Sequence, residues 1–108
     1  MHELKDCYEY KIFVGCNDAQ THDEVVGGEE LKVMIAQFFE RNRIDFSIFN
    51  VTGGYLYEDG CFVTEDTLCV NFIGDSELDI SRFAKSLSMY MNQELLMITR
   101  QPVRAQLM

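Results

Sequence analysis

The densest run of chemically active side chains lies between residues 16 and 24. It holds the Cys16 thiol, the His22 imidazole and the carboxylates of Asp18, Asp23 and Glu24. Zinc takes cysteine, histidine and carboxylate ligands, so a metal-binding loop is one reading of this segment. Its spacing matches no structural zinc pattern, however, and His2 is the chain's only other histidine. We therefore expect no metal and no cofactor, and keep the metal-binding loop as the last-ranked alternative.

The sequence marks no catalytic residue. Cys16 and His22 could act as a nucleophile and its base only with an orienting third group and an oxyanion pocket, and nothing indicates either. Glu65 and Asp66 are adjacent carboxylates, but neighbours on a strand point to opposite faces, which does not suit shared acid–base work. The sequence thus favours a protein without catalytic activity over an enzyme.

Six segments of regular structure must position these side chains. The spacing of their apolar residues distinguishes strands, with a period of two, from helices, with a period of about 3.6. An apolar period of two predicts strands over residues 8–15, 45–57, 61–73 and 95–107. A helical stripe predicts a helix over 29–43 and a second helix that carries apolar residues from Ile80 to Met91. Ser76 and Asp79 resemble a capping box before that second helix. Asp59-Gly60 predicts a type I′ hairpin turn, and Gly53-Gly54 predicts a bulge or bend.

The order β-α-β-β-α-β is that of the ferredoxin-like α+β fold. We expect one domain over residues 1–108, with a flexible N-terminal segment over 1–7. Right-handed crossovers predict a four-stranded antiparallel sheet in the order 4-1-3-2 with both helices on one face. Pro102 agrees with an edge position for the last strand. A different α+β sandwich is the alternative.

Several short segments carry a resemblance to a known family. They are Tyr10–Gly15, Phe46–Gly54, Glu65–Leu68, Asn92–Leu96 and Gln101–Val103. Together they resemble a small bacterial family of ferredoxin-like βαββαβ domains without an established activity, over about residues 8–107. The resemblance implies the fold and carries over no catalytic residue.

The charge balance restricts the kinds of partner. Nine Lys and Arg face 18 Asp and Glu, which gives a formal charge of −9. This disfavours direct binding of nucleic acid and of anionic membranes, and favours a basic protein surface. No export signal, long apolar run or CxxC pair is present, so we expect a cytoplasmic protein with reduced thiols.

The predicted fold gathers acidic residues at one end of the sheet, because the first strand–helix loop and the central hairpin share that end. This acidic pole comprises Asp18, Asp23, Glu24, Glu29, Glu30, Glu58 and Asp59. It predicts a small acidic protein-interaction module that inhibits a basic, nucleic-acid-binding protein. Small acidic bacteriophage proteins that inhibit nucleic-acid-binding defence enzymes are similar in size and charge. Solvated loops and helix caps are the simpler interpretation of the same residues.

The sheet face away from the helices suggests a second mode of interaction. We expect Phe13, Phe49, Cys69 and Ile73 on it, and a partly apolar open face is usually covered. The sequence therefore predicts a homo-oligomer, a dimer by default, through this face or an edge strand. The alternative function follows from it: an oligomeric small-ligand sensor or enzyme, with its pocket between the sheet and the partner subunit.

Overall fold

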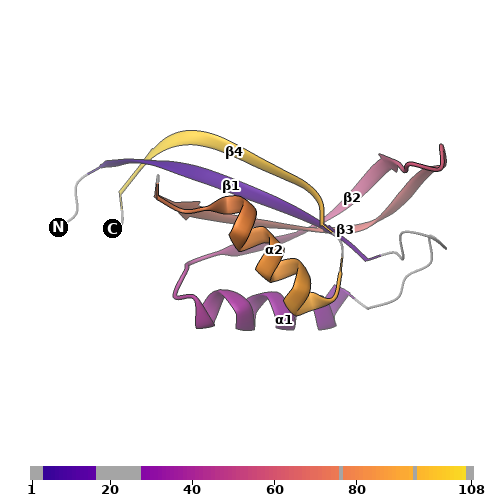
Figure 1. Ribbon diagram of the computed structural model, residues 1–108, viewed down its shortest axis with the longest axis horizontal. Helices are drawn as coiled ribbons and strands as arrows, with labels where there is room; N and C mark the ends of the chain where they lie inside the picture. The colour runs from indigo at the N-terminus through magenta and orange to yellow at the C-terminus, as the bar shows by residue number, and fades with distance from the viewer. Residues whose placement is uncertain (1–3, 17–27, 76, 94, 107–108) are drawn as a thin grey trace.

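The computed structural model describes residues 4–16, 28–75, 77–93 and 95–106. The elements are β1 (Lys5–Gly15), α1 (Gly28–Arg41), β2 (Ser47–Leu56), β3 (Phe62–Gly74), α2 (Ile80–Met91) and β4 (Leu95–Ala105). All six predicted segments are present in the predicted order, with bounds that differ by up to three residues (Figure 1).

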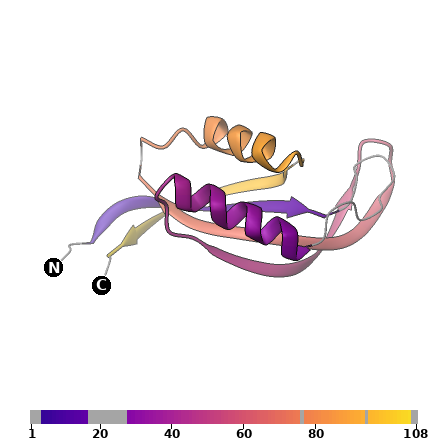
Figure 2. The ribbon, with the colours of Figure 1, turned by 90° about the horizontal axis from the view of Figure 1, so that it is seen from below.

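The four strands form one antiparallel sheet in the order β2-β3-β1-β4. This is the predicted order, and both helices cover the same face of the sheet (Figure 2). The α+β, ferredoxin-like fold class is therefore confirmed. β2 and β4 are the two edges.

The core lies between the helices and the inner face of the two central strands. Alternate residues of β1 and β3 supply the sheet side: Tyr10, Ile12, Val14, Leu68, Val70 and Phe72. The apolar stripes of α1 and α2 supply the other side, with Leu31, Ile35, Phe39, Ala84, Leu87 and Met91 buried. The period-two and helical patterns thus identified the buried faces correctly.

The starts of β1 and α2 depend on contacts that the sequence did not indicate. β1 begins at Lys5, and residues 5–7 pair with residues 103–105 of β4, so part of the segment expected to be flexible is a paired strand. Helix α2 is capped by Asp79, whose side chain accepts a hydrogen bond from the Arg82 amide at 3.1 Å. Ser76, the predicted cap, lies outside the described residues.

The turn of the β2–β3 hairpin is not type I′. Such a turn needs a positive φ at both central residues, and here Gly60 has φ 85° while Asp59 does not have a positive φ. The Gly60 amide donates to the Tyr57 carbonyl at 2.9 Å, which gives a three-residue loop with glycine in the left-handed region. The β2–β3 register runs unbroken through Gly53 and Gly54, so the predicted bulge is absent there.

Hydrogen bonds fix which backbone groups face the sheet edges. The Tyr57 amide donates to the Cys61 carbonyl, so odd-numbered residues of β2 bond to β3 and even-numbered ones point outward. The Cys16 amide donates to the Asp66 carbonyl, which assigns even-numbered residues of β3 to β1. By the same alternation Pro102 points outward from β4. Its missing N–H therefore costs the sheet no hydrogen bond, as expected for an edge strand.

The hairpin of β2 and β3 extends beyond the rest of the sheet (Figures 1 and 2). β1 ends at Gly15, opposite Thr67, whereas the β2–β3 ladder continues to the pair of Leu56 and Phe62. Residues 53–56 and 62–65 are therefore paired only with each other. Neither described helix is long and apolar enough to cross a membrane.

Candidate functional site

A polar cluster lies on the open face of the sheet, where the hairpin leaves β1. Glu65 and Thr67 are 5% and 1% exposed, and they are the buried polar side chains of the described residues. The Tyr57 hydroxyl donates to Glu65 Oε1 at 2.6 Å, and the Tyr55 hydroxyl donates to Thr67 Oγ1 at 3.3 Å. We call Tyr55, Tyr57, Glu65 and Thr67 the tyrosine–glutamate cluster. A carboxylate is seldom buried unless it is hydrogen-bonded, so these contacts explain how the fold tolerates Glu65.

Strand geometry brings the four side chains together. Side chains of one face recur every second residue, so Tyr55 and Tyr57 share a face of β2. Glu65 and Thr67 lie on the same face of β3, since the register pairs Glu65 with Gly53 and Thr67 with Val51. The two tyrosines therefore reach back along the hairpin to the two buried polar groups.

Gly53 has a specific part in this arrangement. A Cβ atom at Gly53 would collide with the ring and hydroxyl of Tyr55, so the ring occupies the space a side chain would take. Because Gly53 is the register partner of Glu65, the Tyr55 ring lies beside the carboxylate. The glycine pair thus serves side-chain packing and not a backbone bulge.

We expect Gly53→Ala to move the Tyr55 ring and weaken its hydrogen bond to Thr67. The expected cost in the free energy of unfolding is about 1–3 kcal/mol, as for other overpacked sites. Urea denaturation measures it. Gly28→Ala is the matched control, because a Cβ there meets nothing within 4 Å and should cost less than Gly53→Ala. Equal losses in the two variants would contradict the packing role of Gly53.

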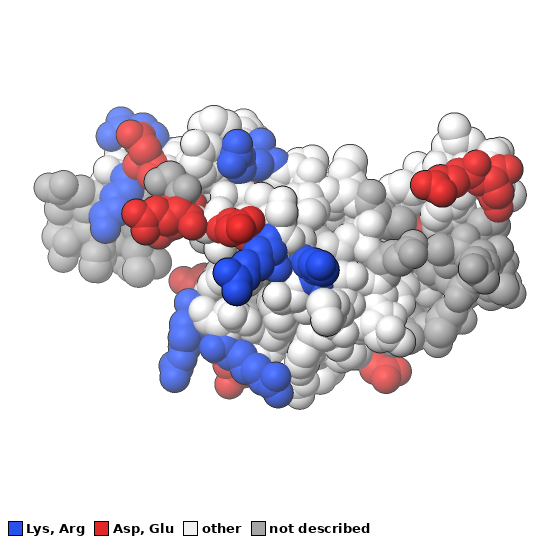
Figure 3. Space-filling model, in the orientation of Figure 1, with Lys and Arg blue, Asp and Glu red and all other residues white. Residues whose placement is uncertain are grey.

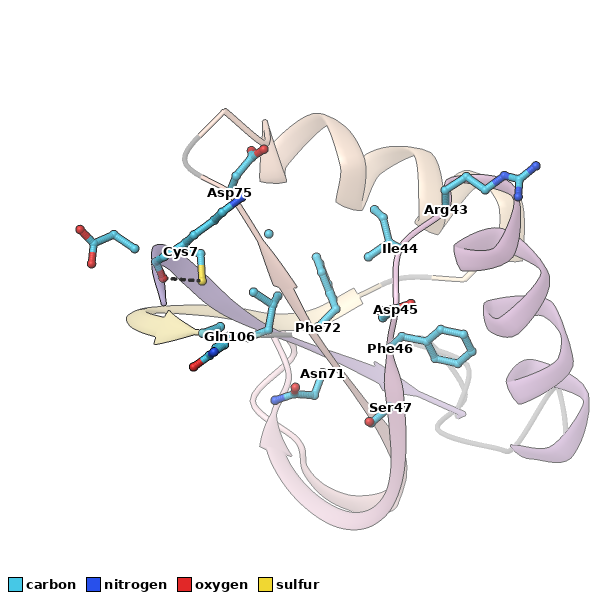
Figure 4. A pocket seen from close by; sticks show the side chains of 15 residues that line it. Cys7, Arg43, Ile44, Asp45, Phe46, Ser47, Asn71, Phe72, Asp75 and Gln106 are labelled. Atoms are coloured by element: carbon cyan, nitrogen blue, oxygen red, sulfur yellow. Dashed lines mark hydrogen bonds between the residues drawn. The ribbon is translucent and has the colours of Figure 1, made fainter. Parts of the chain in front are cut away.

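Two of the cavities along the sheet lie at its opposite ends. One of 270 Å³ adjoins Thr67 on the helix side, with Asn50, Asp66 and the start of α1 in its wall. A larger one of 670 Å³ lies at the opposite end of the sheet, among Ile44, Phe46, Phe72 and Ile73 (Figure 4). Charged residues at the larger cavity have roles in the fold: Asp6 pairs with Arg104 at 3.5 Å, and Asp75 accepts a hydrogen bond from the Glu77 amide.

The acidic pole predicted from the sequence is described only in part. Asp18, Asp23 and Glu24 lie outside the described residues. Glu29 and Glu30 are exposed in the first turn of α1, at the same end of the sheet as the hairpin (Figure 1). Glu29 pairs with Lys32 at 3.1 Å. Acidic residues are common in the first turn of a helix, where the helix dipole stabilises them, so these two residues are explained by the helix itself.

The hairpin turn holds the remaining two members of the pole. Glu58 and Asp59 are exposed, and Asp59 accepts a hydrogen bond from the Cys61 amide at 2.9 Å. In Figure 3, Lys and Arg gather over the middle of the molecule and the end that holds the chain termini, whereas the hairpin end shows Asp and Glu. No Lys or Arg occurs between residues 44 and 81. The hairpin end is therefore anionic.

Cys16 is buried, while His22 lies outside the described residues. The residues that the structure describes contain no group of three His, Cys, Asp or Glu side chains able to hold a metal ion. The Cys16–Glu24 segment is mostly outside those residues, so the metal-binding alternative stays a prediction.

The predicted open-face residues are partly adjacent. Cys69 pairs with Phe13 on one side and Phe49 on the other, which places the three in a row across three strands. Ile73 lies further along the same face, opposite Glu9. Phe49 and Ile73 are exposed, whereas Cys69 is buried between its neighbours. The face is thus partly apolar, as expected, and its role in oligomerisation stays a prediction.

Burial raises the pKa of the Cys69 thiol above its ordinary value; the Glu9 carboxylate adds to this rise and Lys11 opposes it. The thiolate fraction at a given pH is therefore lower than for an ordinary cysteine, and only the thiolate reacts quickly. We expect iodoacetamide at pH 8 to modify exposed Cys61 several times faster than Cys69, with the difference narrowing as the pH rises. Mass spectrometry of the modified peptides measures both rates, and equal rates at pH 8 would contradict the prediction.

Sequence reasoning missed the tyrosine–glutamate cluster. Glu65 and Asp66 do point to opposite faces, as predicted, but Glu65 finds its partner across the hairpin and not beside it in the sequence. The available signal was a tyrosine and a glutamate eight residues apart, on either side of the Asp59-Gly60 turn.

No family model matches this sequence, and no curated protein matches it. Two solved structures are similar in fold. A phage SAM (S-adenosylmethionine) lyase in the apo state has a TM-score of 0.62 and 23% identity, over 99% of this chain and 94% of that chain. A phage SAM lyase in complex with S-methyl-5′-thioadenosine has a TM-score of 0.61 and 21% identity, over 94% and 90% of the two chains.

This likeness overturns two predictions made from the sequence. The prediction of an acidic module that inhibits a basic protein is wrong. The prediction of a protein without catalytic activity is wrong as well. Both solved proteins that share this architecture over nearly their whole length are phage SAM lyases. The charge count does not separate these interpretations, because an acidic surface attracts any cation, whether a small molecule or a basic protein. The alternative, an enzyme with a small-molecule ligand, agrees better with the chain's structural neighbours.

Proposed function

We propose that this protein is an enzyme that binds and cleaves S-adenosylmethionine as a lyase, at the tyrosine–glutamate cluster, with a second copy completing the pocket. The observation that carries the proposal is a carboxylate, Glu65, held almost out of solvent by a tyrosine hydroxyl in a chain whose fold matches SAM lyases. Buried ionisable groups with a specific partner are frequent at functional sites.

The charge of the substrate fits this end of the molecule. S-adenosylmethionine carries a fixed positive charge on its sulfonium sulfur, which no change of pH removes. The hairpin carries no cationic side chain, whereas Glu58, Asp59, Glu65 and Asp66 lie on it. An anionic surface of this kind raises the local concentration of a cationic ligand and its rate of association.

The ligand also needs a surface for its planar adenine base, and aromatic side chains supply one. Tyr55 and Tyr57 belong to the cluster, and exposed Phe49 lies on the same face of β2. Aromatic faces stack on planar bases and attract cations, so the same face can receive both the adenine and the sulfonium. The polar groups of the cluster would then orient the ligand.

The reaction explains why a carboxylate suits the site. A lyase that yields S-methyl-5′-thioadenosine breaks the bond between sulfur and the aminobutyrate chain, and the electron pair of that bond goes to sulfur. No water is added, so the fragment either closes a ring as its own carboxylate oxygen attacks the carbon that leaves sulfur, or forms a double bond as it gives up a proton to a base. Sulfur becomes neutral, and Glu65 therefore attracts the substrate more strongly than the thioether product. The Tyr57 hydroxyl keeps the carboxylate in one orientation, which favours a reactive arrangement of the ligand.

A second subunit would provide the wall that a single chain lacks. The cluster lies on the face of the sheet that carries no helix, beside apolar side chains that include Phe49 and Val51. Ligand sites usually enclose most of their ligand, and they occur often at interfaces. The proposed pocket therefore lies between this face and the partner subunit.

The direct test is incubation of the purified protein with S-adenosylmethionine and chromatographic measurement of S-methyl-5′-thioadenosine. A reaction without protein corrects for spontaneous breakdown. We expect product formation well above that background and no cleavage of S-adenosylhomocysteine, which lacks the sulfonium charge. Binding of S-methyl-5′-thioadenosine without turnover of the substrate would contradict the enzyme and support a ligand sensor. Neither binding nor turnover would contradict the function as a whole.

A further inference from the structure

The hydroxyl group of Thr67 connects two members of the tyrosine–glutamate cluster. Thr67 is 1% exposed, and its hydroxyl donates a hydrogen bond to the backbone carbonyl of Glu65, with an oxygen–oxygen distance of 3.4 Å. The same Oγ1 atom accepts a hydrogen bond from the Tyr55 hydroxyl at 3.3 Å. Because a carbonyl oxygen can only accept, the single hydroxyl proton of Thr67 points to Glu65, and the Tyr55 proton points to Thr67.

The direction of these two hydrogen bonds decides what the half-buried Tyr55 hydroxyl offers to a ligand. A phenolic hydroxyl has one proton to donate and lone pairs that accept. With its proton turned to Thr67, Tyr55 presents the negative end of its hydroxyl dipole to a ligand on the open face. Turning the proton the other way would remove the donor from a buried threonine oxygen, and buried polar atoms seldom lack a partner.

The Tyr55 hydroxyl lies beside the Glu65 side chain. A Cβ atom at Gly53 would be 2.2 Å from the Tyr55 hydroxyl oxygen, so this oxygen occupies the place of the missing Gly53 side chain. Gly53 is the register partner of Glu65, and the Cβ positions of such partners are about 4.5–5.5 Å apart. A cation attracted to the Glu65 carboxylate therefore also comes close to the Tyr55 oxygen.

We propose that Thr67 determines specificity through Tyr55: it holds the Tyr55 proton away from the ligand, so that the Tyr55 oxygen favours a sulfonium cation over a neutral thioether. The inference rests on the proposed function and adds to it a residue too deeply buried to touch the substrate. Thr67 is thus a positioning residue. A dipole that is already oriented stabilises a positive charge without having to turn when the ligand binds.

Replacing Thr67 by Val keeps the shape of the side chain and removes its hydroxyl, so the Tyr55 proton can turn to the ligand. We expect kcat/KM for S-adenosylmethionine to fall about fivefold, the effect of one hydrogen bond. The inhibition constant of neutral S-methyl-5′-thioadenosine should change little, and Thr67→Ser should restore kcat/KM. Thr64→Val is the matched control, because Thr64 is exposed on the other face of β3. Equal losses for both ligands would overturn the proposal.

A double-mutant cycle shows whether the effect passes through the tyrosine hydroxyl. Tyr55→Phe leaves the buried Thr67 side chain in place, and should by itself weaken the preference for the sulfonium substrate over the thioether. Adding Thr67→Val to Tyr55→Phe should cause no further loss in kcat/KM, because no Tyr55 proton remains to be oriented. Losses that simply add, or a preference that Tyr55→Phe leaves unchanged, would contradict the role of Thr67.

The outcomes separate this inference from the proposed function. An active wild type whose Thr67→Val variant keeps both its activity and its ligand preference would overturn the role of Thr67 and leave the enzyme standing. A wild type that neither binds nor cleaves S-adenosylmethionine would contradict the proposed function and, with it, the role of Thr67. Urea denaturation of the same variants measures the Tyr55–Thr67 contact independently, as a coupling in the free energy of unfolding.

Discussion

Replacing Glu65 by Gln should reduce kcat/KM for S-adenosylmethionine cleavage by about 100-fold, because the attraction of the carboxylate for the sulfonium charge, taken as about 3 kcal/mol for a contact to a charged group, is lost from substrate binding. The substitution keeps the shape of the side chain and removes its charge. Because the Tyr57 hydroxyl can still donate to the amide oxygen, the packing of the hairpin should persist. The loss should therefore appear in activity and not in folding, as measured by chromatography of the product and by urea denaturation.

Asp66 offers a matched control for the charge. It is the next residue of β3, it carries the same charge, and it is exposed on the other side of the strand. Asp66→Asn therefore removes the same net charge without altering the cluster, and we expect an activity close to wild type. Equal losses in the two variants would show that only the overall charge matters, and would contradict the role given to Glu65.

Two further measurements separate the proposed roles of Glu65 and Tyr57. The neutral product S-methyl-5′-thioadenosine should lose less affinity than S-adenosylmethionine in Glu65→Gln, because the carboxylate acts on the sulfonium charge. Tyr57→Phe removes one hydrogen bond to a charged group, worth about 1.5–3 kcal/mol, but leaves the Glu65 charge in place. We therefore expect a loss in kcat/KM at the lower end of this range, about tenfold. Isothermal titration and steady-state kinetics provide these values. An unchanged preference between the two ligands in Glu65→Gln would contradict the electrostatic role.

The sequence predicted the fold because its local signals agree with each other. The alternation of Tyr10, Ile12 and Val14 defines a strand that is buried on one face. Each helix has one apolar stripe, and these stripes pack against that face. Pro102 added information on topology, since proline is tolerated where the strand has no neighbour. These are short-range properties of the chain, which explains why they could be recognised without the structure.

The candidate site could not be predicted in the same way. Its central contact, from Tyr57 to Glu65, depends on the hairpin register and on the absence of a side chain at Gly53. Glycine in a strand marks either a bulge or bend of the backbone, or a place where another group approaches closely. The sequence does not separate these two cases, so Gly53-Gly54 predicts a bulge or bend where the structure has close packing of a side chain. The surplus of acidic residues likewise predicts a positively charged partner, but it does not distinguish a small molecule from a protein. The ligand class in the proposed function comes from the structurally similar lyases and not from the sequence.

Phe39 connects both layers of the molecule, and its truncation should have the largest effect on stability. Its ring is fully buried on α1, 5.1 Å from the ring of Phe72 on β3 and 5.5 Å from that of Phe83 on α2. Phe39→Ala therefore leaves a cavity that no single element can close. We expect a loss of about 3–5 kcal/mol in the free energy of unfolding. This is a large share of the 5–15 kcal/mol typical of whole domains.

Urea denaturation at one fixed protein concentration measures the loss, so that any self-association affects both variants equally. Phe62→Ala is the control, because it removes the same atoms from a side chain that is 68% exposed at the end of the hairpin. We expect that change to cost well under half as much. The contrast between the two variants also tests the layer arrangement itself. If Phe62→Ala were as destabilising as Phe39→Ala, the hairpin end would be part of a core, and α1 would not be the element that holds the sheet to α2.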